Sequence, residues 1–202
     1  FAGINAFGRR DLPVEPLTRI AVLRAAGLHA AAEQIYESLL SRRPSDPQLV
    51  YEHISNHFLL ASSNGAHADS GIETIYSQLA DAPGTADVGL YGLGLIRSHQ
   101  KNYQDALAYF QRIGNQRQKY LNNSMGYVYL QMGELDRAET CFRSEIDLGG
   151  NLEGAVSNLA HVLFRTGRID KLLALVQDAR THPYLGYSER RLLAFLRFDL
   201  LG

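Results

Sequence analysis

The chain has 202 residues, of which 46% are hydrophobic and 20% are charged, so it is too apolar to stay disordered and long enough to bury a core. Its 20 Lys and Arg residues nearly cancel its 21 Asp and Glu residues and leave a net charge of −1, which argues against general electrostatic binding of nucleic acid or anionic lipid. The single cysteine, Cys141, excludes an internal disulfide framework and any zinc site built from several cysteines.

The two ends of the sequence bear on whether the chain is part of a longer or membrane-anchored protein. It begins with Phe1 rather than Met, and residues 1–8, which are apolar except for Asn5, are followed by Arg9 and Arg10. No stretch reaches about 18 consecutive apolar residues, so the sequence predicts no transmembrane helix. We expect a cytoplasmic segment of a longer protein. A membrane anchor outside this segment is one explanation of the apolar ends, and helix-packing or frayed termini are the other.

A helical pattern recurs along the chain, in which a small or apolar residue is followed four positions later by an aromatic or apolar one. In chain order the pairs are Ala32 and Tyr36, Ile72 and Tyr76, Ala106 and Phe110, Ala138 and Phe142, and Leu172 and Val176. Successive pairs are 40, 34, 32 and 34 residues apart. Residues four positions apart share one face of a helix, and a period of this size is typical of repeat architectures.

A further helix is predicted before each of the last three pairs. Gly94, Gly126 and Ala160 each lie 12 residues ahead of the first member of a pair, where a small side chain lets two helices approach closely. Gly133 and Gly167 are expected to take the left-handed conformation that ends the first helix of a unit. Each unit is therefore predicted to consist of a helix, a tight turn and a second helix.

Proline and polar residues mark the limits of the units. The predicted second helices of the first two units are expected to end near Pro44 and Pro83, because proline ends a helix and redirects the chain. Asp46 and Pro47 are expected to cap and start the next first helix. The polar residues 62–69 form a predicted insertion in a turn, which accounts for the spacing of 40 residues.

These features together resemble the tetratricopeptide repeat (TPR) family, whose units of about 34 residues place Leu-Gly, Tyr, Ala and Phe at set intervals. The best-matching unit carries Met125, Gly126, Tyr129, Gly133, Ala138 and Phe142 at the corresponding places. The resemblance implies an all-α fold, a right-handed α-solenoid of about five two-helix repeats with a C-terminal capping helix. The expected repeats cover residues 15–46, 47–86, 87–118, 119–152 and 153–186, followed by a terminal helix at 187–201 and preceded by a linker at 1–14.

The resemblance also implies a function, the binding of a partner protein or peptide in a concave groove lined mainly by first helices. Asn and Gln can pair with a peptide backbone, Arg can hold a carboxylate, and Tyr gives rigid contact area. The alternative is that these side chains pack between helices or form a solvated face. The groove positions carried onto this sequence are Tyr91, His99, Tyr120, Asn123, Tyr127, Gln131, Asn158, His161, Arg165 and Arg191.

Two other functions remain open. One is a regulatory or substrate-recruiting domain of a larger membrane-anchored protein or enzyme. The other is self-assembly into a homo-oligomer, since residues 44–96 carry six acidic and no basic residues, whereas residues 97–120 carry five basic residues and one acidic residue. Such opposed bands favour either the steering of a basic partner or head-to-tail contact between copies.

The sequence carries no motif of an enzyme or a cofactor site, so we expect neither catalysis nor a cofactor. His53 and His57 lie one helical turn apart, a spacing that can hold zinc. We favour a packed or surface pair, because Ile54 rather than Glu follows the first histidine and the metalloprotease motif is absent. Cys141 is interpreted as a small residue that packs between helices.

Overall fold

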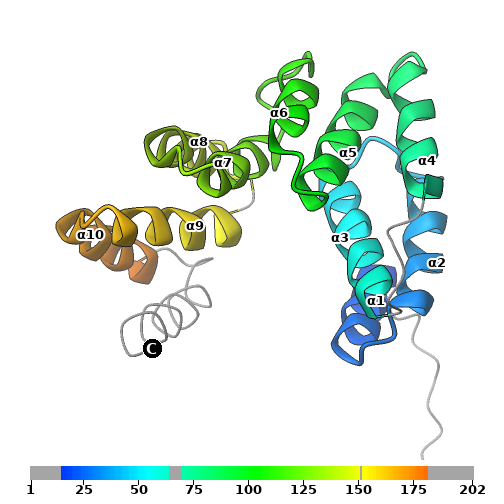
Figure 1. Cartoon of the computed structure of the whole chain (residues 1–202). Coiled ribbons are helices and arrows are strands. Elements are labelled where there is room, and N and C mark those ends of the chain that lie inside the picture. The colour runs from blue at the N-terminus through cyan, green and yellow to red at the C-terminus, as the bar shows by residue number, and fades with distance from the viewer. Residues whose placement is uncertain (1–14, 64–69, 151, 182–202) are drawn as a thin grey trace, which may run out of the picture.

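The computed structural model describes residues 15–63, 70–150 and 152–181, and ten α-helices in these ranges form a curved stack (Figure 1). The predicted all-α solenoid is confirmed. The expected linker at 1–14, the terminal helix at 187–201 and Arg191 lie outside the described residues. The helices are α1 (Pro16–Ala25), α2 (His29–Leu40), α3 (Pro47–Ser63), α4 (Ser70–Asp81), α5 (Ala86–His99), α6 (Tyr103–Gln111), α7 (Leu121–Gln131), α8 (Leu135–Asp147), α9 (Leu152–Arg165) and α10 (Ile169–Thr181).

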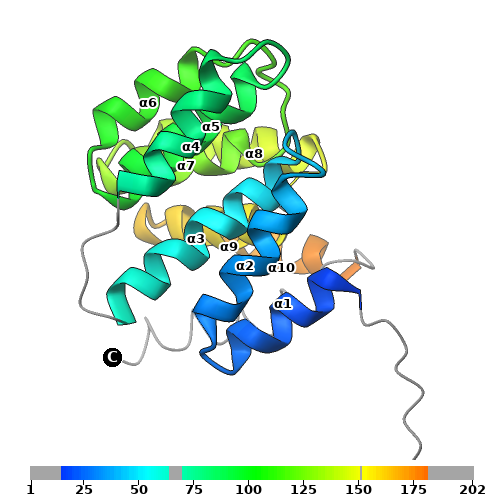
Figure 2. The same cartoon turned by 90° about the vertical axis from the view of Figure 1, so that its right-hand side faces the viewer.

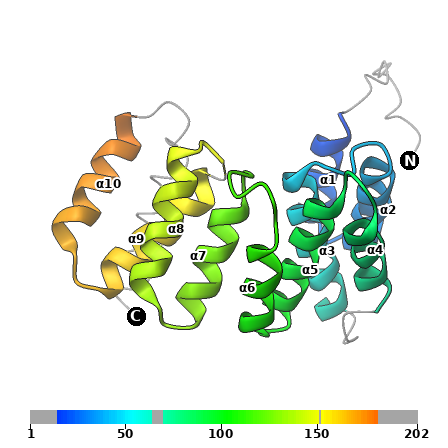
Figure 3. The same cartoon turned by 90° about the horizontal axis from the view of Figure 1, so that it is seen from above.

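Helices α1 to α5 lie at one end of the stack, and α6 to α10 follow in chain order toward the other end (Figure 3). Figure 2 looks along the stack from its N-terminal half, with α1 to α3 in front of α9. Apart from α3 and α4, neighbours in the chain pack closely together, and α3, α5, α7 and α9 also contact one another in succession. Contacts between successive even-numbered helices are weaker or missing in the described residues. The odd-numbered helices therefore form the inner row of the curve.

The core lies between the two rows and is built from the recurring pairs that the sequence predicts. Their members in α2, α4, α6 and α8 are all buried, as is Leu172 of α10. The small residues of the inner row explain how the rows approach each other: a β-carbon at Gly94 would overlap the ring of Phe110, and one at Gly126 would overlap the ring of Phe142. Helix packing at these positions thus requires glycine.

The predicted turns and caps are confirmed where the structure describes them. Gly133 has a φ of 80° and Gly167 a φ of 67°, both in the left-handed region that ends a helix. The carboxylate of Asp46 accepts hydrogen bonds from the backbone N–H groups of Gln48 (3.1 Å) and Leu49 (3.2 Å), with Pro47 as the first residue of α3.

The second unit differs from the sequence expectation in one respect. The predicted insertion begins later than expected, because α3 continues through Ser63 and its residues 62 and 63 are helical. The hydrophobic core divides near the N-terminus. Ile20, Ala32, Tyr36, Leu39 and Leu49 form a cluster of their own, beside the larger cluster that runs from Val50 to Leu172.

Candidate functional site

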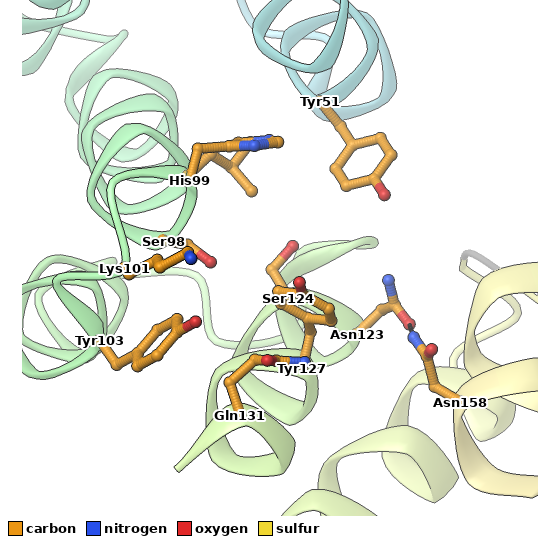
Figure 4. Close-up of a pocket in the computed structure, with 11 residues that line it drawn as sticks. Tyr51, Ser98, His99, Lys101, Tyr103, Asn123, Ser124, Tyr127, Gln131 and Asn158 are labelled. Carbon is orange, nitrogen blue, oxygen red and sulfur yellow. Dashed lines mark hydrogen bonds between the residues drawn. The ribbon is translucent and has the colours of Figure 1, made fainter. Parts of the chain in front are cut away.

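A cavity of about 350 Å³ opens where the inner helices α3, α5, α7 and α9 meet (Figure 4). Figure 4 shows Tyr51 and His99 on one side of it, and Asn123, Ser124 and Tyr127 on the other. Residues from four successive inner helices thus contribute to one surface. The cavity is lined by Tyr51, Leu95, Ser98, His99, Lys101, Tyr103, Asn123, Ser124, Tyr127, Gln131 and Asn158.

Side-chain hydrogen bonds hold the inner helices in register around this cavity. The hydroxyl groups of Tyr91 in α5 and Ser124 in α7 lie 3.0 Å apart, in hydrogen-bonding contact. The side-chain amide of Asn158 in α9 donates to Oδ1 of Asn123 in α7 over 3.2 Å. Because these bonds join neighbouring units, they keep the cavity walls at fixed positions.

The start of α7 is positioned from the next helix. Tyr120, which precedes α7, has a φ of 71°, in the left-handed region. Its backbone N–H donates to Oε1 of Glu145 over 2.6 Å, and the N–H of Asn123 donates to Oε2 of the same carboxylate over 3.3 Å. Glu145 is fully buried in α8, so an acidic side chain occupies a core position, where it accepts hydrogen bonds from N–H groups at the start of α7.

Aromatic rings form much of the cavity wall. The rings of Tyr51 and Tyr120 lie 6.0 Å apart between centroids, and His99 stacks on Phe58 at 4.4 Å. Tyr127 is 43% exposed and presents its ring to the cavity from α7. Desolvation raises the pKa of the Tyr51 and Tyr127 hydroxyls, so both remain protonated hydrogen-bond donors at neutral pH.

The cavity carries little charge, and that charge is positive. None of the lining residues is Asp or Glu, and Lys101 is the lysine among them. Desolvation lowers the pKa of His99 below its ordinary value, so its imidazole is neutral at neutral pH. The cavity is therefore suited to neutral or acidic groups rather than to basic ones.

The structure brings five of the predicted groove residues together in this cavity: His99, Asn123, Tyr127, Gln131 and Asn158. The others are placed differently. Tyr91 is fully buried, so its prediction as a groove-lining side chain has to be corrected. Tyr120 is half-buried against Tyr51, His161 is partly buried on α9, and Arg165 is exposed at the end of α9.

Several lining residues were missed by the sequence reasoning. Tyr51 lies on α3, whose register is hard to determine from the sequence because the second unit matches the repeat pattern poorly. Lys101 lies in the turn after α5, at a position where the pattern gives no reason to expect a groove residue. The remaining missed residues are Leu95, Ser98, Tyr103 and Ser124.

His53 and His57, the pair considered for zinc, both contact Glu33 of α2. His53 is 2% exposed, and its Nε2 lies 3.1 Å from Oε1 of Glu33, while its Nδ1 lies 3.0 Å from the hydroxyl of Tyr76. His57 Nδ1 lies 2.9 Å from the same Glu33 oxygen. No group of three His, Cys, Asp or Glu residues in the described ranges is arranged to hold a metal ion. These contacts support a packed pair.

Cys141 lies half-buried in α8, where burial raises the pKa of its thiol to about 11. The thiol is therefore protonated at neutral pH and is a poor nucleophile. Its place against the core supports the interpretation of Cys141 as a packing residue.

The paired helices, the inner row and the cavity define a class of protein, the two-helix repeat solenoids. Residues 89–118 and residues 120–146 each match a tetratricopeptide repeat model, so the chain contains TPR repeats. Repeats of this family generally serve as protein–protein interaction modules and are typically non-catalytic. No described helix has the length and apolar character needed to span a membrane.

Solved structures are similar to this one in fold. One is TTC0263, a thermophilic TPR protein of Thermus thermophilus, at 23% identity with a TM-score of 0.59, covering 89% of this chain and 97% of that one. Another is MamA 41-end from Desulfovibrio magneticus RS-1, at 13% identity with a TM-score of 0.50, covering 87% of this chain and 94% of that one. No curated protein gives a significant match.

Proposed function

We propose that the chain is a non-catalytic interaction module that binds an extended segment of a partner protein in the cavity between α3, α5, α7 and α9. The observation that carries this proposal is the convergence of an exposed aromatic ring, Tyr127, with the amides of Asn123, Gln131 and Asn158 around one cavity. Pockets that bind ligands combine apolar and aromatic area with a few placed polar groups, as this one does.

The amides suit the backbone of an extended peptide. A side-chain amide has two N–H donors and one acceptor oxygen, and the bond between Asn158 and Asn123 uses one donor and one acceptor. Asn123 is buried, whereas Asn158 is partly exposed, so the remaining amide groups of Asn158 can bond to peptide C=O and N–H groups. Gln131 lies one helical turn beyond Tyr127 on α7 and extends the same polar row.

The aromatic residues supply the contact area. Tyr gives a large, rigid and amphipathic surface at low conformational cost, which is why it often dominates the energy of interfaces. Tyr127 is free to change its contacts because it is exposed, whereas the ring of Tyr51 is held in place by its contact with Tyr120 behind the cavity. A peptide side chain that enters the cavity would pack between Tyr127 and Tyr51.

The proposal is tested by selecting binders from a random peptide library displayed on phage. The selected peptides are then measured against the unchanged chain and against Tyr127→Ala and Asn158→Ala. We expect Tyr127→Ala to weaken binding about tenfold or more, the usual effect of truncating a central aromatic contact. Leu173→Ala is the matched control, because Leu173 is an exposed hydrophobic residue on α10 outside the cavity.

Binding that is unchanged in Tyr127→Ala and Asn158→Ala would reject this cavity as the site. Arg165→Ala is measured in parallel, since a loss of binding there would extend the site along α9. Light scattering over a range of concentrations tests whether the chain assembles into a homo-oligomer. A dimer that Tyr127→Ala disrupts would show that a second copy of the chain, rather than a peptide of another protein, occupies the cavity.

A further inference from the structure

The turn between α5 and α6 places a lysine where the corresponding turns have glycine. Lys101 is the second residue after α5 and has a φ of 64°, in the left-handed region. The residue at the same place after α1, α7 and α9 is Gly27 (φ 71°), Gly133 (φ 80°) and Gly167 (φ 67°), respectively. In each of these turns the backbone N–H of the residue after the left-handed one donates to a carbonyl oxygen in the preceding helix, so the four turns share one geometry.

A side chain at this position works against the backbone. The left-handed conformation costs a residue with a β-carbon roughly 1 kcal/mol relative to glycine. Residues held in such conformations cluster at functional sites, where their side chains are needed. The position of Lys101 is therefore better explained by what its side chain does than by the requirements of the turn.

Lys101 lies between two hollows of the surface. It lines the cavity described above, and it also lines an adjoining hollow of about 400 Å³ together with Tyr103, Asp105 and Met132. Tyr103 is likewise shared by the two hollows. A peptide that occupies the cavity can thus continue past Lys101 into the second hollow. The peptide residue beside Lys101 is then an internal residue rather than a terminal one.

The charges around Lys101 favour an acidic group in the first cavity. No carboxylate in the described part of the chain forms an ion pair with Lys101, and none lines the first cavity. Asp105 lines the second hollow and would repel an acidic group there. The cavity side of Lys101 is therefore the place where a carboxylate is attracted and not opposed.

We propose that the cavity selects an internal Asp or Glu side chain of the extended partner segment, whose carboxylate pairs with the ammonium group of Lys101. This inference rests on the proposed function and adds the chemistry of the ligand. Because Lys101 is exposed, the ion pair forms at the rim of the site, where it is partly screened by water and salt. It therefore acts more on the choice of peptide than on the total affinity.

The test uses the random peptide library in two formats, with the random segment either internal or at a free C-terminus. Both are selected against the unchanged chain. We expect the internal library to be enriched in Asp or Glu at one position. Replacing that residue by Asn or Gln should weaken binding about fivefold, the upper range for an exposed ion pair, and the effect should shrink at high salt.

Two substitutions at the turn separate charge from folding. Lys101→Gly removes the ammonium group but suits the positive φ, so its binding loss cannot be attributed to unfolding. We expect it to bind acidic peptides about fivefold more weakly and their Asn or Gln counterparts equally well, whereas Lys101→Arg retains the preference. Lys119→Gln is the matched control, since Lys119 is exposed and lines neither hollow.

The outcomes distinguish this inference from the proposed function. Peptides that bind in a Tyr127-dependent manner but show no acidic preference, or whose preference survives Lys101→Gly, would overturn the inference and leave the proposed function in place. Acidic enrichment confined to the free C-terminus would also overturn it, because the carboxylate would then be terminal. Failure to select any peptide whose binding depends on Tyr127 or Asn158 would overturn both.

Discussion

The carboxylate of Glu145 in α8 accepts a hydrogen bond of 2.6 Å from the backbone N–H of Tyr120, the residue that precedes α7. The same carboxylate bonds to the N–H of Asn123, so one buried side chain serves two of the N–H groups that a helix start leaves without partners. Since Asn123 and Tyr127 of α7 line the cavity, the geometry of the site depends on a residue that does not line it.

Removing this carboxylate should destabilise the fold. Glu145→Ala leaves two backbone N–H groups without this acceptor in a buried environment, and we expect it to lower the free energy of unfolding by about 2–3 kcal/mol. Glu145→Gln keeps one acceptor oxygen and should cost about 1 kcal/mol. Urea denaturation followed by circular dichroism measures both.

Asp147→Ala is the control for this pair, because Asp147 is an exposed acidic residue at the end of the same helix. Its effect should stay within about 0.5 kcal/mol. If Glu145→Ala were as mild as Asp147→Ala, the two hydrogen bonds would not stabilise the start of α7.

The stability of the N-terminal half should fall in acid because of Glu33. Burial acts to raise the pKa of this carboxyl, but hydrogen bonds from His53, His57 and Asn56 outweigh it and lower the pKa from 4.5 to about 2. Since the pKa is lower in the folded chain, the stabilisation is fully present above pH 4.5 and is lost as the pH falls from there toward 2. Its size is on the order of 3 kcal/mol.

This pH dependence is measured by urea denaturation at a series of pH values. In Glu33→Gln the loss of stability between pH 4.5 and 2 should be smaller, because the titrating group has been removed. Glu37→Gln, at an exposed position on the same helix, should keep the acid loss of the unchanged chain. An identical acid profile in Glu33→Gln would show that other carboxylates cause the loss.

The sequence predicts the fold well because packing repeats along the chain. Ala106 with Phe110 and Ala138 with Phe142 are read as core pairs from spacing alone, and the structure buries all four. Charge obscures the pattern at Glu145, which stands at a place where other units have a nonpolar residue. No local signal indicates that this carboxylate bonds to a helix start 25 residues earlier in the chain.

The cavity is harder to predict because it depends on contacts between units. Tyr91 and His99 are both on α5, yet Tyr91 is buried in the core with its hydroxyl in contact with that of Ser124, while His99 lines the cavity. Helical periodicity places residues on faces of one helix, and the next helix decides which face stays open. Tyr51 is missed because the register of α3 is hard to determine from the sequence, and Lys101 because it lies in a turn rather than on a helix face.

The close contact between Gly126 and Phe142 should be sensitive to a single methyl group. Gly126→Ala brings a β-carbon against the Phe142 ring, and overpacking of this kind costs about 1–3 kcal/mol. In the double variant with Phe142→Leu the second substitution removes the ring. Thermal or urea denaturation of the two single variants and the double variant therefore gives a coupling energy.

We expect Gly126→Ala to cost less in the Phe142→Leu background than in the unchanged chain. Strictly additive losses would contradict the contact, because residues that touch each other couple and distant residues do not.

Opposite substitutions at equivalent turns should change stability in opposite directions. Lys101→Gly relieves the left-handed conformation of a residue with a β-carbon, so we expect the free energy of unfolding to rise by about 0.5–1 kcal/mol. Gly133→Lys imposes the same conformation on a lysine in the turn after α7 and should lower it by about 1 kcal/mol. Nothing lies within 4 Å of a β-carbon at Gly133, so the stability that Gly133→Lys loses reports backbone strain rather than a steric clash.

Urea denaturation of the two variants provides the comparison. A decrease in stability for Lys101→Gly would mean that the Lys101 side chain stabilises the fold by more than its backbone strain costs, and would remove the argument that this lysine is retained for binding.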